Sequence, residues 1–188
     1  LVVVNGVYSE ELSEKMIVKG LTVNSLNELS DSEKALLCSQ AKSDTDALIA
    51  LNTAFSANGL FLQVDRNNII PMPLHVIYVN SGNANIVTNT RSFINVLANA
   101  QATLIESFYN IGSAKVFSNF VSEKFVGENA KLTCHTFQNE GALSYSVNTN
   151  QVKINKYSNY SNTTMTLSGE LVRNNHNVVL ADSNCEAH

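Results

Sequence analysis

The side chains best suited to metal or thiol chemistry are three cysteines and four histidines, spread along the chain. Cys134 and His135 are adjacent, and a thiolate beside an imidazole could bind iron or zinc. Neighbouring residues of a strand point to opposite faces of a sheet, however, so these two side chains do not readily reach one ion. We therefore expect Cys134 to pack in the core and His135 to be exposed.

A second candidate pair lies near the C-terminal end of the sequence. Cys185 and His188 are three residues apart with Glu186 between them, a spacing that could ligate a metal from a loop. Cys185 occupies the same place in a recurring sequence pattern as Ala102 and Leu132, which are both apolar. Core packing is therefore the expected role of Cys185.

Histidine-based catalysis and nucleotide binding have no support in the sequence. His75 follows a Pro-x-Pro-Leu segment and is expected on a strand face, and His176 lies in the polar run 174–177. Neither has a Ser or Cys nucleophile at a recognisable motif spacing, so no catalytic triad is predicted. The phosphate-binding patterns GxxxxGK[ST] and GxGxxG are absent.

Paired carboxylates would be needed for a glycosidase, and glutamates do recur near the ends of predicted strands. Nothing in their spacing pairs them, so solvated or cross-strand roles are expected. They are Glu106, Glu123, Glu128 and Glu140. The sequence thus predicts no catalytic, cofactor-binding or metal-ligating residue and indicates a non-catalytic scaffold.

Composition narrows the class of protein further. Hydrophobic residues make up 44% of the chain and charged residues 15%, which allows a sizeable core. The net charge is −4, and Lys115, Lys124 and Lys131 are scattered, so we expect them to be solvated and expect no nucleic-acid partner. Three cysteines without CxxC spacing favour free thiols in a reducing compartment. Without a membrane-spanning apolar segment or a recognisable signal peptide, the expected location is the cytoplasm and no membrane is a partner.

Three stretches resemble one another, namely Val96–Ile105, Val126–His135 and Val179–His188. Ala100 and Ala130 occupy matching points. Recurrence at a period of about 20–50 residues is typical of solenoids, in which one unit cannot bury its apolar face alone. Because the third stretch reaches the last residue, we expect a solenoid that continues in a longer protein.

The first 59 residues are expected to form a small α/β region. Residues 1–8 contain an Asn-Gly turn and are predicted to form a hairpin. The clearest helix is predicted over 44–58, capped by Ser43 or Asp44 and stopped by Gly59. Its apolar stripe comprises Ala47, Leu48, Leu51, Ala54 and Phe55.

From residue 60 to 188 the pattern changes to short β-branched or aromatic runs separated by Asn, Gly and Ser. A β-sandwich would alternate similarly but does not explain the recurrent stretches. The expected fold is therefore mainly β, a parallel β-helix. Asn tolerates a left-handed backbone, so stacked corners could place Asn side chains in ladders.

Longer strings resemble the SufB/SufD family of iron–sulfur cluster assembly proteins. Leu51–Val64 and Ile70–Val79 are similar to the segment that links helices to the β-helix in that family. Asn95–Ser107, Phe117–Leu132 and Leu171–Ala187 are similar to successive turns of that β-helix. The order of segments is most like the N-terminal portion of SufD.

The resemblance implies a right-handed parallel β-helix that pairs with a SufB-like protein and, through a C-terminal helical domain, with a SufC-like ATPase. It implies a scaffold of the SUF complex rather than an enzyme, with an iron–sulfur cluster held transiently by the full complex and no cofactor bound by this fragment. The SufC-docking helices and an interface histidine of the family are expected beyond residue 188, so no site residue is transferred.

Two other functions remain open at this point. A secreted-type polysaccharide-active β-helix enzyme, a lyase or hydrolase, would need clustered acidic calcium ligands and a basic residue in one groove. The three arginines do not lie among grouped aspartates. A direct metal carrier would use Cys134, His135 or Cys185. The exposed edge of the last turn also predicts a homodimer of this chain, end to end or edge to edge.

Overall fold

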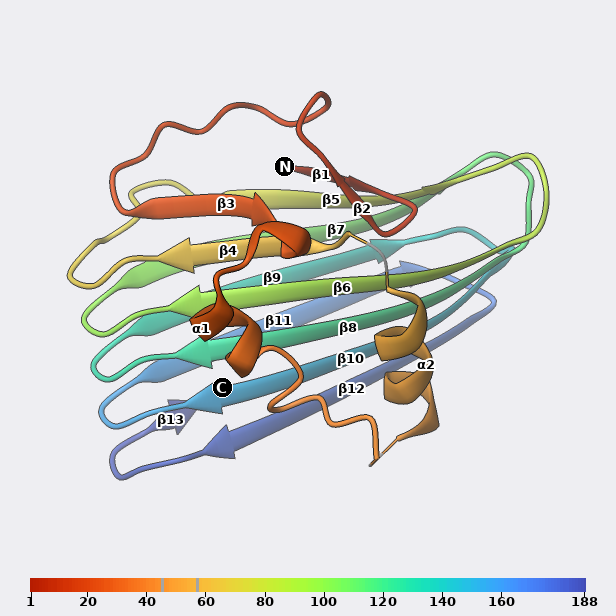
Figure 1. Cartoon of the computed structure of the whole chain (residues 1–188). Coiled ribbons are helices and arrows are strands. Elements are labelled where there is room, and N and C mark those ends of the chain that lie inside the picture. Colours follow the sequence, from red (N-terminus) through yellow and green to blue (C-terminus); the bar gives the residue numbers. More distant parts are fainter. Residues whose placement is uncertain (45, 57) are drawn as a thin grey trace.

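The computed structural model of the chain describes residues 1–44, 46–56 and 58–188. In this part of the chain two mainly parallel sheets lie face to face, and the chain passes from one to the other (Figure 1). Sheet A contains, in spatial order, β13 (Glu186–Ala187), β11 (Asn159–Ser168), β9 (Lys131–Asn139), β7 (Gln101–Ile111), β5 (Leu74–Ser81), β1 (Val2–Val4) and β2 (Val7–Ser9). Sheet B contains β12 (Leu171–Leu180), β10 (Ser144–Ile154), β8 (Val116–Val126), β6 (Ile86–Val96), β4 (Leu60–Val64) and β3 (Leu21–Ser25). This arrangement confirms a mainly β, parallel β-solenoid fold.

Equivalent residues of successive turns lie directly above one another. Val96 is aligned with Val126, Val126 with Ile154, and Ile154 with Leu180. The first three of these side chains are fully buried between the sheets, and each buried aliphatic side chain of this size stabilises the fold by about 1.5–3 kcal/mol. The largest group of buried apolar residues runs along this interior and includes Leu62, Val64, Leu74, Val76, Leu104, Leu132 and Cys134.

Asparagines form the corner by which the chain passes from sheet B to sheet A. Asn67, Asn99 and Asn129 have φ angles of 61°, 58° and 53°, in the left-handed region that Asn tolerates. Each amide bonds the next: Asn99 Nδ2 donates to Asn67 Oδ1 and Asn129 Nδ2 to Asn99 Oδ1, both at 2.9 Å. Ala100 and Ala130 follow and are buried. The expected corner asparagines, their ladder and the matching alanines are confirmed.

The third of the recurrent stretches is offset by one residue from its expected alignment. Leu180, its second apolar residue, aligns with the first apolar residue of the other two stretches. The corner that follows is one residue longer, and Cys185 immediately follows a left-handed Asn, as Ala130 does. The expected match of Cys185 to Ala102 and Leu132 is therefore wrong.

Two strands, β6 and β10, each join two separate short runs of the sequence pattern. The short β-branched or aromatic runs at 86–88 and 93–97, and those at 143–148 and 151–157, predict separate strands, whereas β6 joins the first two runs and β10 joins the other two. The polar residues between the runs are buried parts of the strand rather than turns. They are Thr90, Arg91 and Ser92 in β6, and Thr149 and Asn150 in β10.

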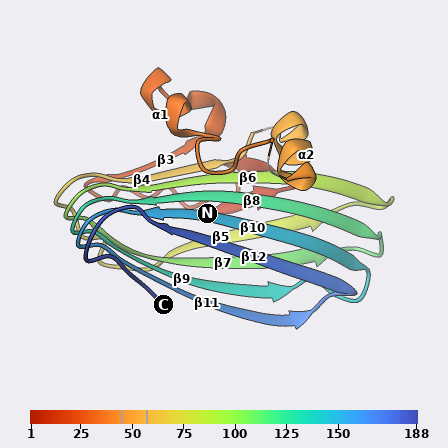
Figure 2. The same cartoon turned by 90° about the horizontal axis from the view of Figure 1, so that it is seen from below.

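Residues 26–44 and 46–56, called here the N-terminal arm, cover the outer face of sheet B (Figure 2). The arm contains η1 (Leu26–Glu28), α1 (Asp31–Leu36) and α2 (Ala47–Phe55). A capping box between Ser30 and Glu33 starts α1. Within the described residues, none of these helices has the length and apolar character needed to cross a membrane.

Helix α2 is shorter than predicted and starts at a different cap. The side chain of Asp46 accepts hydrogen bonds from the backbone N–H groups of Leu48 and Ile49, so Asp46, rather than Ser43 or Asp44, is the N-cap. The helix extends to Phe55, and its C-cap is the extended Ser56 rather than a left-handed glycine.

The predicted apolar stripe of α2 is also wrong. Phe55 is 68% exposed, and Ala47 and Ala54 are exposed as well. The buried residues of the helix are Ile49 and Asn52. Hydrophobic periodicity placed the wrong face inward because the outer surface of sheet B offers polar partners to this helix.

Gly59 has a role other than stopping a helix. A Cβ atom at this position would lie 1.9 Å from the carbonyl oxygen of Arg91. Glycine therefore permits the close backbone approach that brings the chain from the arm into β4.

Candidate functional site

Two clusters of charged and polar side chains are buried on opposite faces of sheet B. Glu123 and Lys124 are neighbours on β8, and both are 0% exposed. Because strand neighbours point to opposite faces, Glu123 lies under the N-terminal arm whereas Lys124 lies between the two sheets. The expectation that Lys124 is solvated is wrong, since sheet A covers it. Glu123 takes the cross-strand role that was one of its two expected roles, because it pairs with Arg91 of the neighbouring strand β6 beneath the arm.

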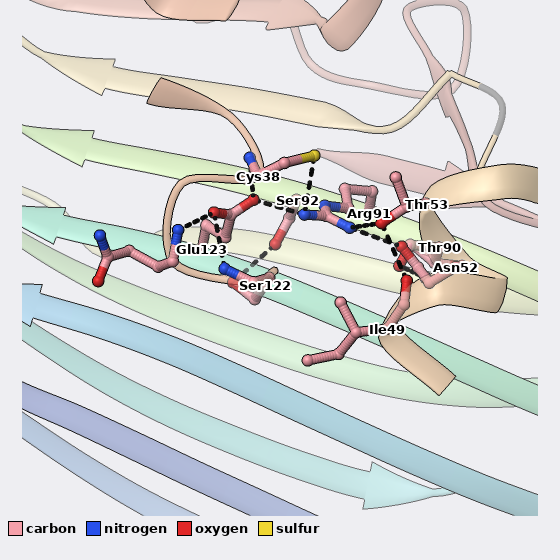
Figure 3. A network of polar contacts seen from close by, with 11 residues as sticks. Cys38, Ile49, Asn52, Thr53, Thr90, Arg91, Ser92, Ser122 and Glu123 are labelled. Carbon is pink, nitrogen blue, oxygen red and sulfur yellow. Dashed lines mark hydrogen bonds and ion pairs between the residues drawn. The ribbon is translucent and has the colours of Figure 1, made fainter. Parts of the chain in front are cut away.

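The outer cluster, called here the arm cluster, is centred on an ion pair (Figure 3). Arg91 Nη2 lies 2.6 Å from Glu123 Oε1, and the two side chains are 2% and 0% exposed. The carboxylate also accepts hydrogen bonds from three backbone N–H groups of the arm, those of Cys38 at 2.8 Å, Gln40 at 3.0 Å and Ala41 at 3.1 Å. Glu123 therefore holds the arm by main-chain hydrogen bonds as well as by charge.

Helix α2 completes the same cluster. Arg91 Nη1 donates to Asn52 Oδ1 at 3.3 Å and to Thr53 Oγ1 at 3.1 Å. Asn52 Nδ2 in turn donates to the carbonyl oxygens of Thr90 and Asn119, each at 2.9 Å. These bonds explain why an amide, rather than a leucine, is the buried residue of this helix.

Cys38 lies at the edge of the arm cluster in a left-handed conformation, with φ 66°. Arg91 Nη2 is 3.3 Å from its Sγ atom. Burial raises the pKa of the Cys38 thiol, and the nearby Arg91 charge offsets this only in part. The thiol is therefore neutral near pH 7, which disfavours a role as nucleophile or metal ligand.

The inner cluster, called here the interior cluster, is also centred on an ion pair. Lys124 Nζ lies 3.2 Å from Glu106 Oε2, and the two side chains are 0% and 2% exposed. The ammonium group donates further hydrogen bonds to Ser122 Oγ at 3.0 Å and Asn150 Oδ1 at 2.5 Å. A charge buried among apolar residues requires this degree of pairing.

Cys134 lies in the core beside this cluster, as expected. Its exposed fraction is 0%, and burial raises the pKa of the thiol to about 12, an effect that the Lys124 charge partly opposes. His135 occupies the opposite face of β9 and is half-buried. The two side chains of the Cys134–His135 pair are thus separated by the strand.

The other two glutamates differ from each other. Glu140 is buried, and its Oε2 accepts hydrogen bonds from Ser144 at 3.3 Å and Ser146 at 2.7 Å. Burial raises the pKa of Glu140. Glu128 is exposed, as expected.

The remaining histidines and Cys185 are dispersed. His75 is exposed on β5, with Nε2 2.9 Å from Ser107 Oγ, and burial followed by the N-terminal charge lowers its pKa. Partial burial and the Lys124 charge lower the pKa of His176, which lies on β12. Cys185 Sγ lies 2.9 Å from the carbonyl oxygen of Asp182.

Metal-ligand residues do not converge in the part of the chain that is described. There, no group of three or more His, Cys, Asp and Glu side chains lies close enough to hold an ion. His188 Nε2 lies 3.8 Å from Glu186 Oε2 on the exposed surface.

Sequence reasoning missed Arg91, Asn52 and Cys38 as partners in one cluster. Arg91 and Glu123 both lie outside the short β-branched or aromatic runs, in polar stretches typical of turns, so no signal marked them as buried. The partners come from the arm, more than 30 residues away along the chain. No local pattern connects them.

Comparison with known proteins now places this architecture in a family. The model for the SUF system FeS cluster assembly SufBD core domain matches residues 78–188, and the model for the SufBD protein N-terminal region matches residues 1–76. An iron–sulfur cluster assembly SufBD family protein of Synechocystis is 27% identical over 188 residues, covering 93% of this chain and 42% of that protein. The iron–sulfur cluster assembly protein SufD of Bacillus subtilis is 31% identical over 146 residues, covering 73% of this chain and 32% of that protein.

The chain thus spans less than half the length of these two relatives. The core-domain match begins within β5 and extends through β13, so it coincides with the stacked turns of the solenoid. The N-terminal match covers the hairpin, the arm and the first turn up to β5. The chain belongs to the SufBD family of iron–sulfur cluster assembly proteins.

Proposed function

We propose that this chain is the N-terminal part of a SufD-like scaffold in the SUF complex, acting with a SufB-like protein and a SufC-like ATPase. The observation that carries the proposal is the match of the SufBD core domain to the turns from β5 to β13. A solenoid of this kind presents a long surface on which partners assemble. The iron–sulfur cluster is the product that the complex builds, and the cytoplasm is its proposed location.

A structural rather than catalytic role is supported by how the charged groups are used. Arg91 and Glu123 hold the arm, and Lys124 and Glu106 neutralise each other inside the solenoid. Burial keeps Cys134 protonated. We propose that the ligands of a nascent cluster come mainly from a partner subunit or from the rest of the SufD-like protein.

Co-expression tests the proposal. The complete gene product should be produced with SufB-like and SufC-like proteins of the same organism and purified by a tag on one partner. We expect a stoichiometric complex of all three. Recovery of the tagged partner alone, with the other proteins soluble but unbound, would count against the proposed scaffold role.

Anaerobic reconstitution tests the competing role of metal carrier. We expect this chain alone, incubated with ferrous iron and sulfide and then desalted, to remain colourless and to retain no iron. The same treatment of the three-protein complex should produce visible absorption of an iron–sulfur cluster. A coloured chain that retains iron would indicate that its own cysteines are cluster ligands.

A further inference from the structure

Inside the solenoid, beside the interior cluster, the two sheets leave a small polar cavity. The space open to the centre of a water molecule is ≈ 10 Å³, roughly what one ordered water requires. Amide and hydroxyl side chains dominate its wall. The lining residues are Glu106, Phe108, Phe120, Thr136, Gln138, Asn148, Asn150, Thr164, Asn174 and His176.

One lining residue, Asn148 on β10, has an unpaired amide. Its exposed fraction is 3%, yet among the described residues neither its Oδ1 nor its Nδ2 atom has a hydrogen-bond partner. A buried amide without partners is unusual in a folded protein and calls for a ligand or a water molecule.

The two neighbours of Asn148 across the sheet explain why it is unpaired. On β8 the aligned residue is Phe120, whose ring cannot form a conventional hydrogen bond with the amide. On β12 the aligned residue is Asn174, which instead exchanges two hydrogen bonds with Gln138, at 2.9 and 3.0 Å. The amide of Asn148 is therefore directed into a polar space without a protein partner.

We propose that this cavity is a binding site for one ordered water molecule, held by both polar atoms of Asn148. The ligand must donate a hydrogen bond to Oδ1 and accept one from Nδ2, and water does both. A cation would face the Nδ2 donor, and an anion would face the Glu106 carboxylate. The Glu106–Lys124 ion pair leaves no net charge for a bound ion to neutralise.

The cavity extends to β12, the outermost described strand of sheet B. Asn174 and His176 line the cavity and are exposed on the last turn of sheet B. The proposed water shares the cavity with these two side chains. Its place is fixed by Asn148, one turn further inside.

High-resolution crystallography of the chain tests this proposal directly. We expect an electron-density peak about 2.7–3.2 Å from both Asn148 side-chain polar atoms, and no anomalous peak there after soaking with sodium bromide or rubidium chloride. A bromide or rubidium peak would show that the cavity binds an ion rather than water, which would overturn the proposal. An empty cavity, with the Asn148 amide turned onto protein partners, would also overturn the proposal.

A matched pair of variants strengthens the test. Asn148→Leu removes both hydrogen-bonding atoms and should abolish the density peak. Asn177→Leu makes the same change at an exposed position of β12 and should leave the peak unchanged. Persistence of the peak in Asn148→Leu would exclude Asn148 as its ligand. Should Asn148→Leu fail to fold, the density and soaks of the unaltered chain still decide the question.

Discussion

The Arg91 guanidinium and the Glu123 carboxylate lie 2.6 Å apart on the outer face of sheet B, with at most 2% of either side chain exposed. Solvent screens such a buried pair far less than a surface pair. Each partner also bonds the N-terminal arm, Arg91 through Thr53 and Glu123 through the backbone of Cys38. The charge pair and the docking of the arm therefore form one cooperative unit.

Replacing Glu123 should detach the arm. Glu123→Ala leaves Arg91 buried without its counter-charge and deprives three backbone N–H groups of their acceptor. We expect the free energy of unfolding to fall by about 3–5 kcal/mol, as for other broken buried ion pairs. Urea unfolding measures this loss, and hydrogen exchange should show faster exchange in residues 31–41.

The matched control is Glu128→Ala, which changes an exposed glutamate two residues after β8. A surface change of this kind should alter the unfolding free energy by no more than about 0.5 kcal/mol. Unchanged hydrogen exchange in the arm of Glu123→Ala would show that the carboxylate does not hold it.

Lys124 should be as important for the interior as Glu123 is for the arm. Lys124→Met keeps the length of the side chain but leaves the Glu106 carboxylate buried without a cation. We expect a loss of about 3–5 kcal/mol in unfolding free energy, measured by urea denaturation. Lys131→Met, at an exposed position of β9, is the control and should be nearly neutral. Equal stability of the two variants would contradict the importance of this pair.

The repeated turns were predictable because their signal is local. At each corner an Asn adopts the left-handed backbone and the small residue after it fits a buried position, as at Asn99–Ala100 and Asn129–Ala130. The offset at Cys185 escaped detection because one extra corner residue shifts the alignment without changing the residue types.

The buried charges were not predictable by the same means. Lys124 was expected to be solvated and Glu123 to be solvated or a cross-strand partner, and nothing nearby in sequence indicates that the arm covers Glu123 and sheet A covers Lys124. The polar centres of β6 and β10 read as turns for the same reason. In each case the deciding partner lies in a different turn or in the arm.

The Asn ladder allows backbone strain to be separated from hydrogen bonding. Asn129→Gly keeps access to φ 53° but loses the bond to Asn99, whereas Asn129→Ala loses both. A left-handed conformation costs a residue with a Cβ about 1–2 kcal/mol, so Asn129→Ala should be less stable than Asn129→Gly. Thermal unfolding of the two variants gives the order. The reverse order would mean that backbone strain does not govern this corner.

The outer edge of β12 should mediate self-association of this chain. β12 is the last strand of sheet B and pairs only with β10 among the described strands (Figure 1). Leu171 and Val179 on it are 50% and 48% exposed. We expect a dimer by light scattering at high concentration, and a weaker one for Val179→Lys, because a charge on an edge strand opposes pairing. A strict monomer would contradict this.

Stability should fall at alkaline pH through Cys134. Its thiol pKa rises from 9.0 to about 12 in the folded chain. Above pH 9 the unfolded chain therefore loses this proton while the folded chain retains it. The stabilisation by the neutral buried thiol is complete below pH 9 and is lost as pH rises towards 12, at about 1.4 kcal/mol per pH unit.

Urea unfolding at pH 8, 9 and 10 should show a shallower decline for Cys134→Ala than for the unaltered chain. Val152→Ala, a core truncation without a titrating group, should be less stable at every pH but keep the original slope. Identical slopes in Cys134→Ala and Val152→Ala would assign the alkaline loss to other groups, such as the buried Tyr78, whose pKa burial also raises.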